Sequence, residues 1–485
     1  FSMKFTDLNP KQEIGAHSLF VEIGEFRLLV DGGMSPRDLG LASLPDYTRI
    51  PKNSIDLILL THCHLDHIGS LPCIHREQPS ARVLMTLASS EILPVMLQNS
   101  YTVMLRQRDE KNVEEYPLFS RPEADAVGDD VFPMHYGRPR EFIKNNDRLR
   151  ITFYPAGHVL GAACVLLEHQ GKKYFFTGDI LFRRQHTLEG AQVPNVKVDT
   201  LITETTRGQV EHPEGFSYEG EMTRLLGSIE KTLKSGGSCL LPVFALGRMQ
   251  EIVTLIHEAR RRSLLPRDFP IYCSGLGLAI VDVFEKICRD RRKYGLDYLA
   301  KDFVRPPNVR QDPKHRLAPG TEIGFRKRVL NALNVRPLPR SRIRPGIDIR
   351  RPSMFITSSG MLVENTPAYQ VAASLLPFGH NLIAFTGFCD PTTPGGELLT
   401  LEKGDLFSFH ALEFDTPIRA RVEKFDLSGH ADRDDIVYMA KELQPSNIIL
   451  THGDADSRAR FDGALRAVLP GVKILNPEPQ ETYEL

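Results

Sequence analysis

The stretch LLTHCHLDHIGSLP at residues 59–72 places three histidines and an aspartate within six positions, directly after an apolar run: His62, His64, Asp66 and His67. Buried imidazoles and carboxylates this close repel one another when charged, so a purely structural role explains them poorly. These ligand types suit Zn²⁺, and the absence of cysteine ligands favours a hydrolytic over a structural site. The stretch can give two ligands to each of two metal ions but cannot complete either coordination sphere.

Three further candidate ligands each follow an apolar strand and have a glycine nearby. His158 lies in PAGHVLGA, Asp179 in FFTGDI and His452 in IILTHGD. One such residue alone is more often an ordinary polar side chain. The repeated arrangement instead predicts that all seven side chains hold two metal ions, which share a bridging carboxylate.

Short β-rich runs position these candidates, because several of them end in a polar side chain. We expect a layered sheet with strands at residues 26–31, 55–61, 149–154, 173–177 and 200–204. After Thr205 helices alternate with strands: a helical face at 222–233, the strand CLLPV and a helix at 249–256. Residues 302–352 predict an irregular connection rich in Pro and Arg. Beyond about Ala420 the pattern returns to strand, helix, strand, helix and strand, with the clearest buried strand at 447–451.

The composition describes a globular protein with 41% hydrophobic and 25% charged residues among 485. A net charge of −1 gives the whole molecule no field that would attract a polyanion. From Phe325 to Pro352, however, the sequence has nine basic residues and only one acidic residue. This local excess indicates either a solvated surface or a nucleic-acid contact. Seven scattered cysteines without a CxxC pair favour reduced thiols. No apolar run could span a bilayer, so we expect no membrane partner and a cytoplasmic location.

Several motifs resemble those of a known superfamily. DGG at 31–33, HCHLDH at 62–67, GH at 157–158 and GD at 178–179 resemble the successive motifs of the metallo-β-lactamase superfamily. ETT at 204–206, PVFALGRMQE at 242–251, SGHAD at 428–432 and THGD at 451–454 resemble its nucleic-acid-processing β-CASP branch. From QEIGAHS at 12–18 to the last strand, the likeness is closest to the mRNA 3′-end processing endonuclease group and its prokaryotic relatives.

The resemblance implies an α/β fold, a metallo-β-lactamase αββα sandwich interrupted by an inserted α/β β-CASP domain. The domains would span residues 1–206, 207–420 and 421–485, with the inserted domain in the middle. That domain would cover the metal face and leave a narrow cleft, so we expect a preference for single-stranded RNA over duplex.

The resemblance also assigns roles to the candidate residues. It implies one Zn²⁺ held by His62, His64 and His158 and a second held by Asp66, His67 and His452, with Asp179 bridging. Asp31 would orient a ligand or the water at the metal. Glu204 matches the motif A acid and His430 the motif B histidine, so His430 held by Glu204 would be the general acid. Asp66, Asp31, Glu204 and His430 form the expected catalytic set. The motif C histidine, His452, favours RNA over DNA.

Substrate contacts are expected in the inserted domain. Arg248 begins a helix after a tight glycine turn, where a phosphate would bind well, or it is only a surface charge. Ser358, Ser359 and Gly360 in TSSGM would cradle a phosphate or only form a helix-entry turn. The sequence departs from the family pattern in GFCDPTTPGG, where Thr392 stands in place of a glycine. His75, His135 and His212 lie in no motif and are interpreted as structural.

These features predict a zinc-dependent ribonuclease that hydrolyses phosphodiester bonds of single-stranded RNA, with two metals and a histidine general acid. The alternatives are a zinc-dependent DNA nuclease and a small-molecule hydrolase such as a thioesterase, which would not need a large inserted domain. A catalytically inactive assembly subunit would have lost ligands, whereas this set is complete. We expect a homodimer or processing-complex partners, and the choice between endonuclease and exonuclease stays open.

Overall fold

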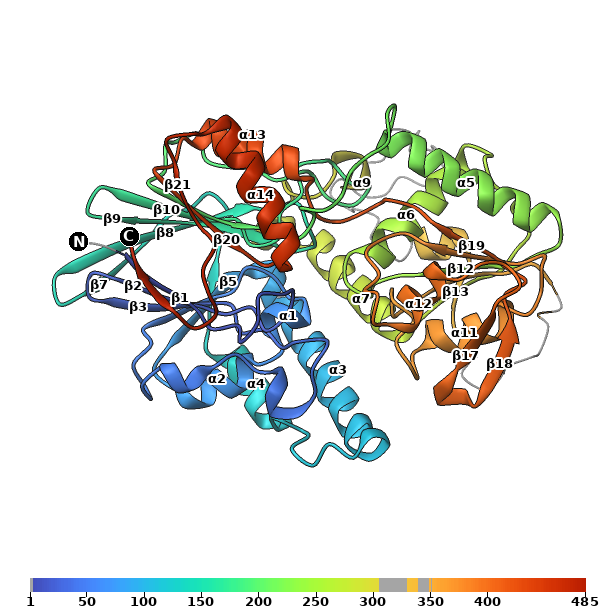
Figure 1. Ribbon diagram of the computed structural model, residues 1–485, viewed down its shortest axis with the longest axis horizontal. Coiled ribbons are helices and arrows are strands. Elements are labelled where there is room, and N and C mark those ends of the chain that lie inside the picture. Colours follow the sequence, from blue (N-terminus) through green and yellow to red (C-terminus); the bar gives the residue numbers. More distant parts are fainter. Residues whose placement is uncertain (1–2, 305–328, 339–348, 350) are drawn as a thin grey trace. The chain divides into compact units, whose positions relative to one another are not determined.

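The computed structural model describes residues 3–304, 329–338, 349 and 351–485 (Figure 1). Most of the basic run between Phe325 and Pro352 lies outside these described residues. The chain divides into two compact units. Unit 1 comprises Phe1–Arg184, Leu188–Glu211 and His430–Leu485, and unit 2 comprises Gln185–Thr187 and His212–Gly429. The units change over after residues 211 and 429, whereas the sequence led us to place the domain boundaries after 206 and 420.

Unit 1 contains two seven-stranded mixed sheets. In spatial order the first sheet consists of β22 (Thr482–Glu484), β1 (Met3–Asp7), β2 (Leu19–Ile23), β3 (Phe26–Val30), β4 (Leu57–Leu59), β5 (Arg82–Thr86) and β6 (Val131–Met134). The second consists of β21 (Lys473–Leu475), β20 (Asn447–Thr451), β11 (Thr200–Glu204), β10 (Lys172–Phe176), β9 (Ala163–His169), β8 (Asp147–Pro155) and β7 (Arg140–Lys144).

The two sheets face each other across an apolar core. Alternate residues of the central strands point into it, such as Leu28 and Val30 of β3 and Tyr174 and Phe176 of β10. The strands β3 to β6 run parallel, as do β10, β11, β20 and β21. The carboxyl ends of these parallel strands carry most of the candidate ligands.

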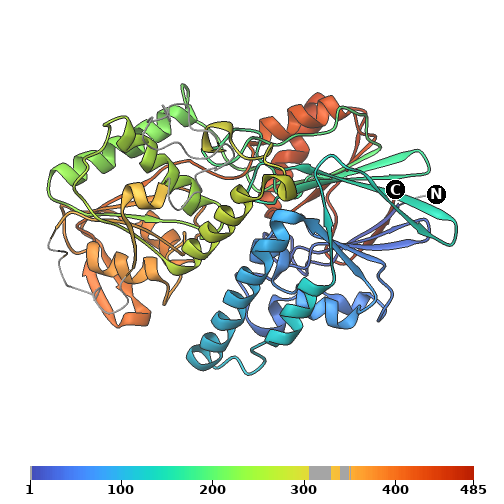
Figure 2. The ribbon, with the colours of Figure 1, turned by 180° about the vertical axis from the view of Figure 1, so that it is seen from behind.

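Helices cover both outer faces of the sandwich in unit 1, as Figures 1 and 2 show from opposite sides. One group lies outside the first sheet: α1 (Leu65–Ile68), α2 (Leu71–Glu77), α3 (Leu87–Lys111) and α4 (Arg121–Asp129). The second sheet is covered by α13 (Arg433–Leu443) and α14 (Ala455–Val468). In the part of the chain that the structure describes, no helix combines the length and the apolar character required to cross a membrane.

The predicted strands are observed, with small differences at their ends. Residues 200–204 and 447–451 form β11 and β20 as expected. The strand expected at 55–61 is shorter, because β4 spans only Leu57–Leu59. Its ladder ends there since the Thr61 N–H donates to the carboxylate of Asp31 (2.7 Å) instead of to a strand.

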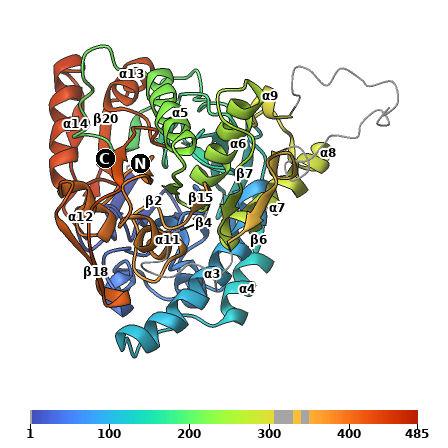
Figure 3. The same ribbon diagram turned by 90° about the vertical axis from the view of Figure 1, so that its right-hand side faces the viewer.

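Unit 2 is built on a six-stranded parallel sheet (Figure 3). Its strands are, in spatial order, β14 (Val335–Pro337), β13 (Ile271–Cys273), β15 (Met354–Thr357), β12 (Cys239–Pro242), β16 (Leu382–Phe385) and β19 (Arg421–Lys424). A hairpin of β17 (Leu406–Phe409) and β18 (Phe414–Pro417) follows separately.

The helices of unit 2 alternate with its strands, as the sequence predicts. They are α5 (Tyr218–Lys234), α6 (Arg248–Arg261), α7 (Gly275–Arg289), α8 (Arg291–Tyr294), α9 (Lys301–Val304), α10 (Asn331–Leu333), α11 (Pro367–Leu375) and α12 (Pro394–Thr400). The chain crosses from β12 through α6 to β13 in one direction along the sheet, and from β15 through α11 to β16 in the opposite direction. Because such crossovers are right-handed, the two helices cover opposite faces of the sheet. Helix α11 packs on Leu240, Phe355 and Ile383, and together they form an apolar cluster of unit 2.

Candidate metal centre

The turn after β4 is held rigidly by backbone contacts. His64 is the N-cap residue of the short helix α1, so Asp66 and His67 lie in its first turn. The Asp66 carbonyl accepts a hydrogen bond from the His17 N–H (3.0 Å). A Cβ on Gly33 would meet this same carbonyl oxygen at 1.7 Å, so only glycine allows the two loops to approach so closely.

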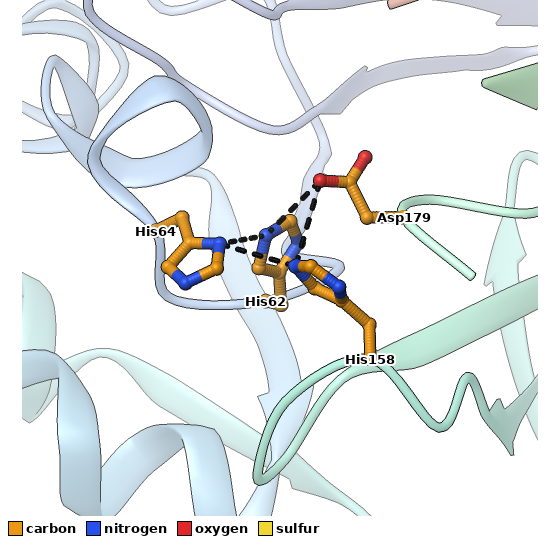
Figure 4. Close-up of side chains that lie close together, drawn as sticks. All are labelled: His62, His64, His158 and Asp179. Atoms are coloured by element: carbon orange, nitrogen blue, oxygen red, sulfur yellow. Dashed lines mark hydrogen bonds and ion pairs between the residues drawn. The ribbon is translucent and has the colours of Figure 1, made fainter. Parts of the chain in front are cut away.

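Four predicted ligands converge in a first group, in which their side chains point toward one another (Figure 4). His64 Nδ1 lies 3.1 Å from His62 Nε2 and 3.1 Å from His158 Nε2. Asp179 Oδ2 lies 3.5 Å from His62 Nε2 and 3.7 Å from His158 Nε2. Two ligands of one tetrahedral Zn²⁺ lie about 3.3 Å apart, given metal–ligand distances of about 2.0–2.1 Å. The spacing of the first group fits one such ion.

The other three predicted ligands form a second group. His452 Nε2 lies 3.1 Å from Asp66 Oδ2 and 3.2 Å from His67 Nε2. Asp179 Oδ2, which belongs to the first group, is also 3.5 Å from His67 Nε2. The carboxylate therefore lies between the two groups, where a bridging ligand belongs.

The hydrogen bonding of Asp179 tests whether this set fits metal ions. The carboxylate is buried, and its Oδ1 atom accepts no hydrogen bond from any described residue, although His452 Nδ1 lies 3.3 Å away. A buried charged oxygen without a partner is costly in a folded protein. Imidazole nitrogens also face one another at 3.1–3.2 Å, which is close to the spacing of two ligands on one cation. Divalent cations held by these seven residues would satisfy all of them.

Electrostatics in the cluster also favours positive charge. Burial alone would lower the pKa of His67, but three nearby carboxylates raise it well above its usual value (Asp179, Asp66 and Asp31). Burial together with the charge of His67 holds the pKa of His62 well below its usual value. The three carboxylates thus favour a positive charge at this position.

Contacts behind the ligands fix the orientation of their rings. Asp31 accepts hydrogen bonds from His67 Nδ1 (2.7 Å) and from the hydroxyl of Thr61 (2.7 Å), so His67 presents Nε2 to its group. His452 Nδ1 lies 3.0 Å from the hydroxyl of Thr206, and its Nε2 likewise faces its group. The expected position of Asp31 behind a ligand agrees with this geometry.

Arg458 of α14 supports the turn that carries His452. Its guanidinium is buried and donates from Nε to the carbonyl of Gly453 (2.8 Å) and from Nη1 to the carbonyl of Leu450 (3.2 Å). Nη2 lies 3.8 Å from a carboxylate oxygen of Asp7. The two carbonyls lie on either side of His452, so Arg458 fixes the backbone of a residue with a left-handed φ of 47°.

His430 lies beside the first group of ligands and is held by Glu204 at the end of β11. His430 Nδ1 is 2.9 Å from Glu204 Oε2, and the two rings of His430 and His158 are 4.5 Å apart. Glu204 Oε1 accepts the N–H of Ile180, the residue after Asp179 (2.6 Å). Burial lowers the pKa of His430, but the charge of Glu204 and its hydrogen bond raise it above the usual value overall. The pair can therefore keep a proton near neutral pH.

Sequence reasoning missed three residues of this centre: His17, Thr206 and Arg458. His17 is buried with its ring 4.9 Å from that of His67 and 5.4 Å from that of His452. It lies in QEIGAHS, and Thr206 lies in ETT, but neither has neighbours at ligand spacing. Arg458 looks like an ordinary charged residue of an amphipathic helix. Only the folded structure shows what these side chains contact.

Family models match three consecutive parts of the chain. The metallo-beta-lactamase superfamily matches residues 13–215, the Beta-Casp domain matches 249–398, and a Zn-dependent metallo-hydrolase RNA specificity domain matches 415–477. Together these models give the chain the domains of the β-CASP branch of the metallo-β-lactamase superfamily. The predicted fold class is thereby confirmed, and the domain set is that of a metal-dependent hydrolase.

Curated relatives of this β-CASP chain are similar over nearly all of its length. Endoribonuclease YSH1 of Yarrowia lipolytica is 29% identical over 100% of the chain and 55% of that protein. Cleavage and polyadenylation specificity factor subunit 3 of Dictyostelium discoideum is 26% identical over 98% of the chain and 56% of that protein. The chain thus spans little more than half the length of these relatives. A solved protein of unknown function from Enterococcus faecalis V583 shares the fold, with a TM-score of 0.54 and 12% identity over all of both chains.

The candidate phosphate contacts of this β-CASP chain all lie in unit 2. Arg248 is buried at the start of α6, where it donates to the carbonyl of Leu427 (2.8 Å) and to the side chain of Gln185. The hydroxyl of Ser358 lies 3.2 Å from that of Ser274. Ser359 Oγ accepts the N–H of Val363 (2.9 Å). The tight turn through Gly360 uses these groups within unit 2, and their binding of phosphate stays a prediction.

A second buried carboxylate, Glu251 of α6, lies in unit 2, and the protein satisfies both of its oxygens with hydrogen bonds. Its Oε1 accepts hydrogen bonds from the backbone N–H (2.6 Å) and Nδ1 (2.7 Å) of His186. Its Oε2 accepts from the backbone N–H and the hydroxyl of Thr187, both at 3.0 Å. Burial raises the pKa of Glu251, but these bonds and nearby charges lower it to about 2 overall.

Proposed function

We propose that this chain is a zinc-dependent endoribonuclease that hydrolyses phosphodiester bonds of single-stranded RNA. One observation carries the proposal: two groups of candidate metal ligands lie on either side of Asp179, and His430, paired with Glu204, lies beside them. Phosphodiester hydrolysis needs both parts, because charge on the phosphate must be neutralised and a leaving oxygen must be protonated. The relatives named endoribonucleases and the match to an RNA specificity domain support RNA as the substrate and internal cleavage.

The seven ligands would hold two Zn²⁺ ions, which when bound lower the pKa of a coordinated water and offset negative charge on the phosphate. Asp31 and Thr206 keep the rings of His67 and His452 turned toward the site. Glu204 binds His430 at Nδ1, so a proton for the leaving 3′ oxygen would come from Nε2. Because Glu204 also binds the backbone next to Asp179, it fixes the distance between the acid and the bridging carboxylate.

The proposal is tested with the purified protein in Zn²⁺ or Mn²⁺ and five substrates. These are a linear single-stranded RNA, the same RNA as a closed circle, the matching single-stranded DNA, a blunt RNA duplex and a panel of thioesters. We expect cleavage of both single-stranded RNAs and little cleavage of the duplex. Opening of the circle shows internal cleavage, because a circle has no end to enter.

Three results would overturn parts of the proposal. Turnover of thioesters alone would identify a small-molecule hydrolase, and equal cleavage of DNA and RNA would remove the RNA preference. Shortening of linear RNA without opening of the circle would indicate an exonuclease. We further propose that the chain works with partner proteins, because one relative is named as a subunit of a specificity factor. Sedimentation of the protein alone distinguishes a homodimer from a monomer that needs such partners.

A further inference from the structure

A groove of about 730 Å³ lies in unit 1 at the opposite end of the first sheet from the metal centre. It is lined by residues at the amino ends of β3, β4 and β5, whereas Asp31 and His62 follow the carboxyl ends of β3 and β4. Phe132 of β6 and the whole of β7 complete its lining. The proposed hydrolysis uses none of these residues.

One wall of the groove is the edge strand of the second sheet. Strand β7 pairs with β8 on one side, and the sheet ends at β7 on the other (Figure 1). Within the described part of the chain, no backbone group outside β8 bonds to residues 140–144. Such an edge offers unpaired N–H and C=O groups to another extended chain. Ile143 of this strand is 60% exposed.

The charges along the groove are unbalanced. Asp56 is bound by Lys144 (2.8 Å) and by the backbone N–H of Arg27 (2.8 Å), and Glu141 is bound by Arg148 (2.8 Å). Both acidic residues of the lining are therefore already paired. The exposed side chains of Arg82 and Arg140 form no ion pair or hydrogen bond with any described residue. The groove thus presents two arginines that need an acid from elsewhere.

The apolar part of the groove is shaped for side chains more than for bases. Phe132 and Phe142 are half-buried, and their rings meet edge to face with centroids 5.8 Å apart. Nucleic-acid platforms need an aromatic face that is open to a base, whereas these rings pack on the apolar core of unit 1. A small branched side chain would extend that core.

We propose that the groove binds an extended acidic segment of a partner protein, which adds a strand to the free edge of β7. In β7 the residues Arg140, Phe142 and Lys144 share one face, because side chains alternate along a strand. The partner's residue facing Arg140 would therefore be acidic, and its residue facing Phe142 would be apolar. Main-chain hydrogen bonds to β7 would give affinity, and the ion pair with Arg82 and Arg140 would give selectivity.

The probe is a fluorescent peptide with two repeats of Glu-Glu-Val-Val, which places acidic and apolar side chains alternately on each face. Binding to the full chain is measured by fluorescence anisotropy at low salt, beside a peptide with Lys in place of Glu. We expect only the acidic peptide to bind and to slow amide exchange in residues 140–144. Arg82→Glu with Arg140→Glu should weaken binding by about tenfold or more. The control Arg460→Glu changes an exposed arginine of α14 outside the groove and should have less than about a twofold effect.

Metal content and RNA cleavage should be the same in the double variant and the parent, so this test does not depend on the proposed nuclease activity. Failure of the acidic peptide to bind, or equal binding to parent and double variant, would overturn the proposal. Binding of a short single-stranded RNA that requires Arg82 and Arg140 would assign the groove to nucleic acid instead. Loss of self-association in the double variant, measured by sedimentation, would assign it to a second copy of this chain.

Discussion

The two units each bury a carboxylate among histidines and other polar groups, but the two carboxylates differ in their hydrogen bonding. Glu251 in unit 2 receives four hydrogen bonds from His186 and Thr187, so the protein satisfies both of its oxygens. Asp179 in unit 1 has a buried oxygen without a hydrogen-bond partner in the described structure, and the imidazole nitrogens around it face one another. The difference teaches how to separate a structural carboxylate from a metal ligand: the first is complete in the protein, and the second is complete only with a cation.

The largest expected effect is the loss of metal from Asp179→Ala. Because its carboxylate lies between both groups of ligands, the variant should lose both Zn²⁺ ions and with them RNA cleavage. Elemental analysis of the purified protein measures this directly. Glu251→Gln is the matched control and should keep two equivalents. Retention of two equivalents by the alanine variant would contradict the ligand assignment.

The next effect concerns His430, which the structure places beside the ligands but in neither metal group. His430→Ala should keep both metals and bind RNA nearly as well as the parent, while the cleavage rate falls by about 10²–10⁴-fold, as expected for a lost general acid. The raised pKa of His430 implies that the rate falls as pH rises through that pKa, because the acid loses its proton. Single-turnover rates across a pH series measure both effects.

Two comparisons distinguish a general acid from a structural histidine. Glu204→Gln should give a smaller defect, and the double variant should be little worse than His430→Ala, because the two side chains act as one unit. A substrate with sulfur at the leaving position needs no proton, so it should restore much of the rate in His430→Ala. Loss of zinc from this variant, or a slow reaction with the sulfur substrate, would require another residue to be the acid.

The third prediction concerns Glu251, the buried carboxylate whose two oxygens both accept hydrogen bonds from the protein. Glu251→Gln should lower the free energy of unfolding by about 2 kcal/mol, since it weakens hydrogen bonds to a buried charge. The pKa of Glu251 is depressed to about 2, so its contribution is present above the unfolded value of 4.5 and is lost as pH falls. The pKa of His186 is raised above 6.5, chiefly by Glu251 against the effect of burial, so its contribution is lost as pH rises. Urea unfolding of parent and variant should differ most between about pH 4.5 and 6.5, and a difference independent of pH would contradict the pairing.

The smallest effect is expected behind the second group of ligands. Arg458→Lys keeps the charge near Asp7 but cannot donate to both carbonyls that flank His452. Affinity for one of the two Zn²⁺ ions should fall about tenfold, the low end for a change behind a ligand. As the chelator concentration rises, the variant should lose one equivalent of Zn²⁺ before the other. The parent should release both equivalents over a narrower range of chelator concentration. Unchanged release would show that β20 fixes His452 without the arginine.

The seven candidate ligands could be selected from the sequence because each follows the end of a strand, where local composition carries the signal, and the structure brings them close together. HxHxDH after an apolar run is such a signal, and β11 and β20 have the predicted bounds for the same reason. The contacts made by His17, Thr206 and Arg458 could not be predicted, since they join residues far apart in the chain. The pairing of Glu251 with His186 is of this kind too, because its partner lies 65 positions away. Whether an isolated polar side chain is a ligand, a brace or a surface charge depends on neighbours that only folding supplies.

The order of the strands in the second sheet has a consequence for folding during synthesis on the ribosome. The ligands of the first group all precede residue 180, but His430 and His452 follow the whole of unit 2. Strand β20 lies between β11 and β21 inside the sheet, not at its edge. A nascent chain can thus gather its first ligand group early, yet its second group is complete only after His452 has been synthesised and β20 has joined β11.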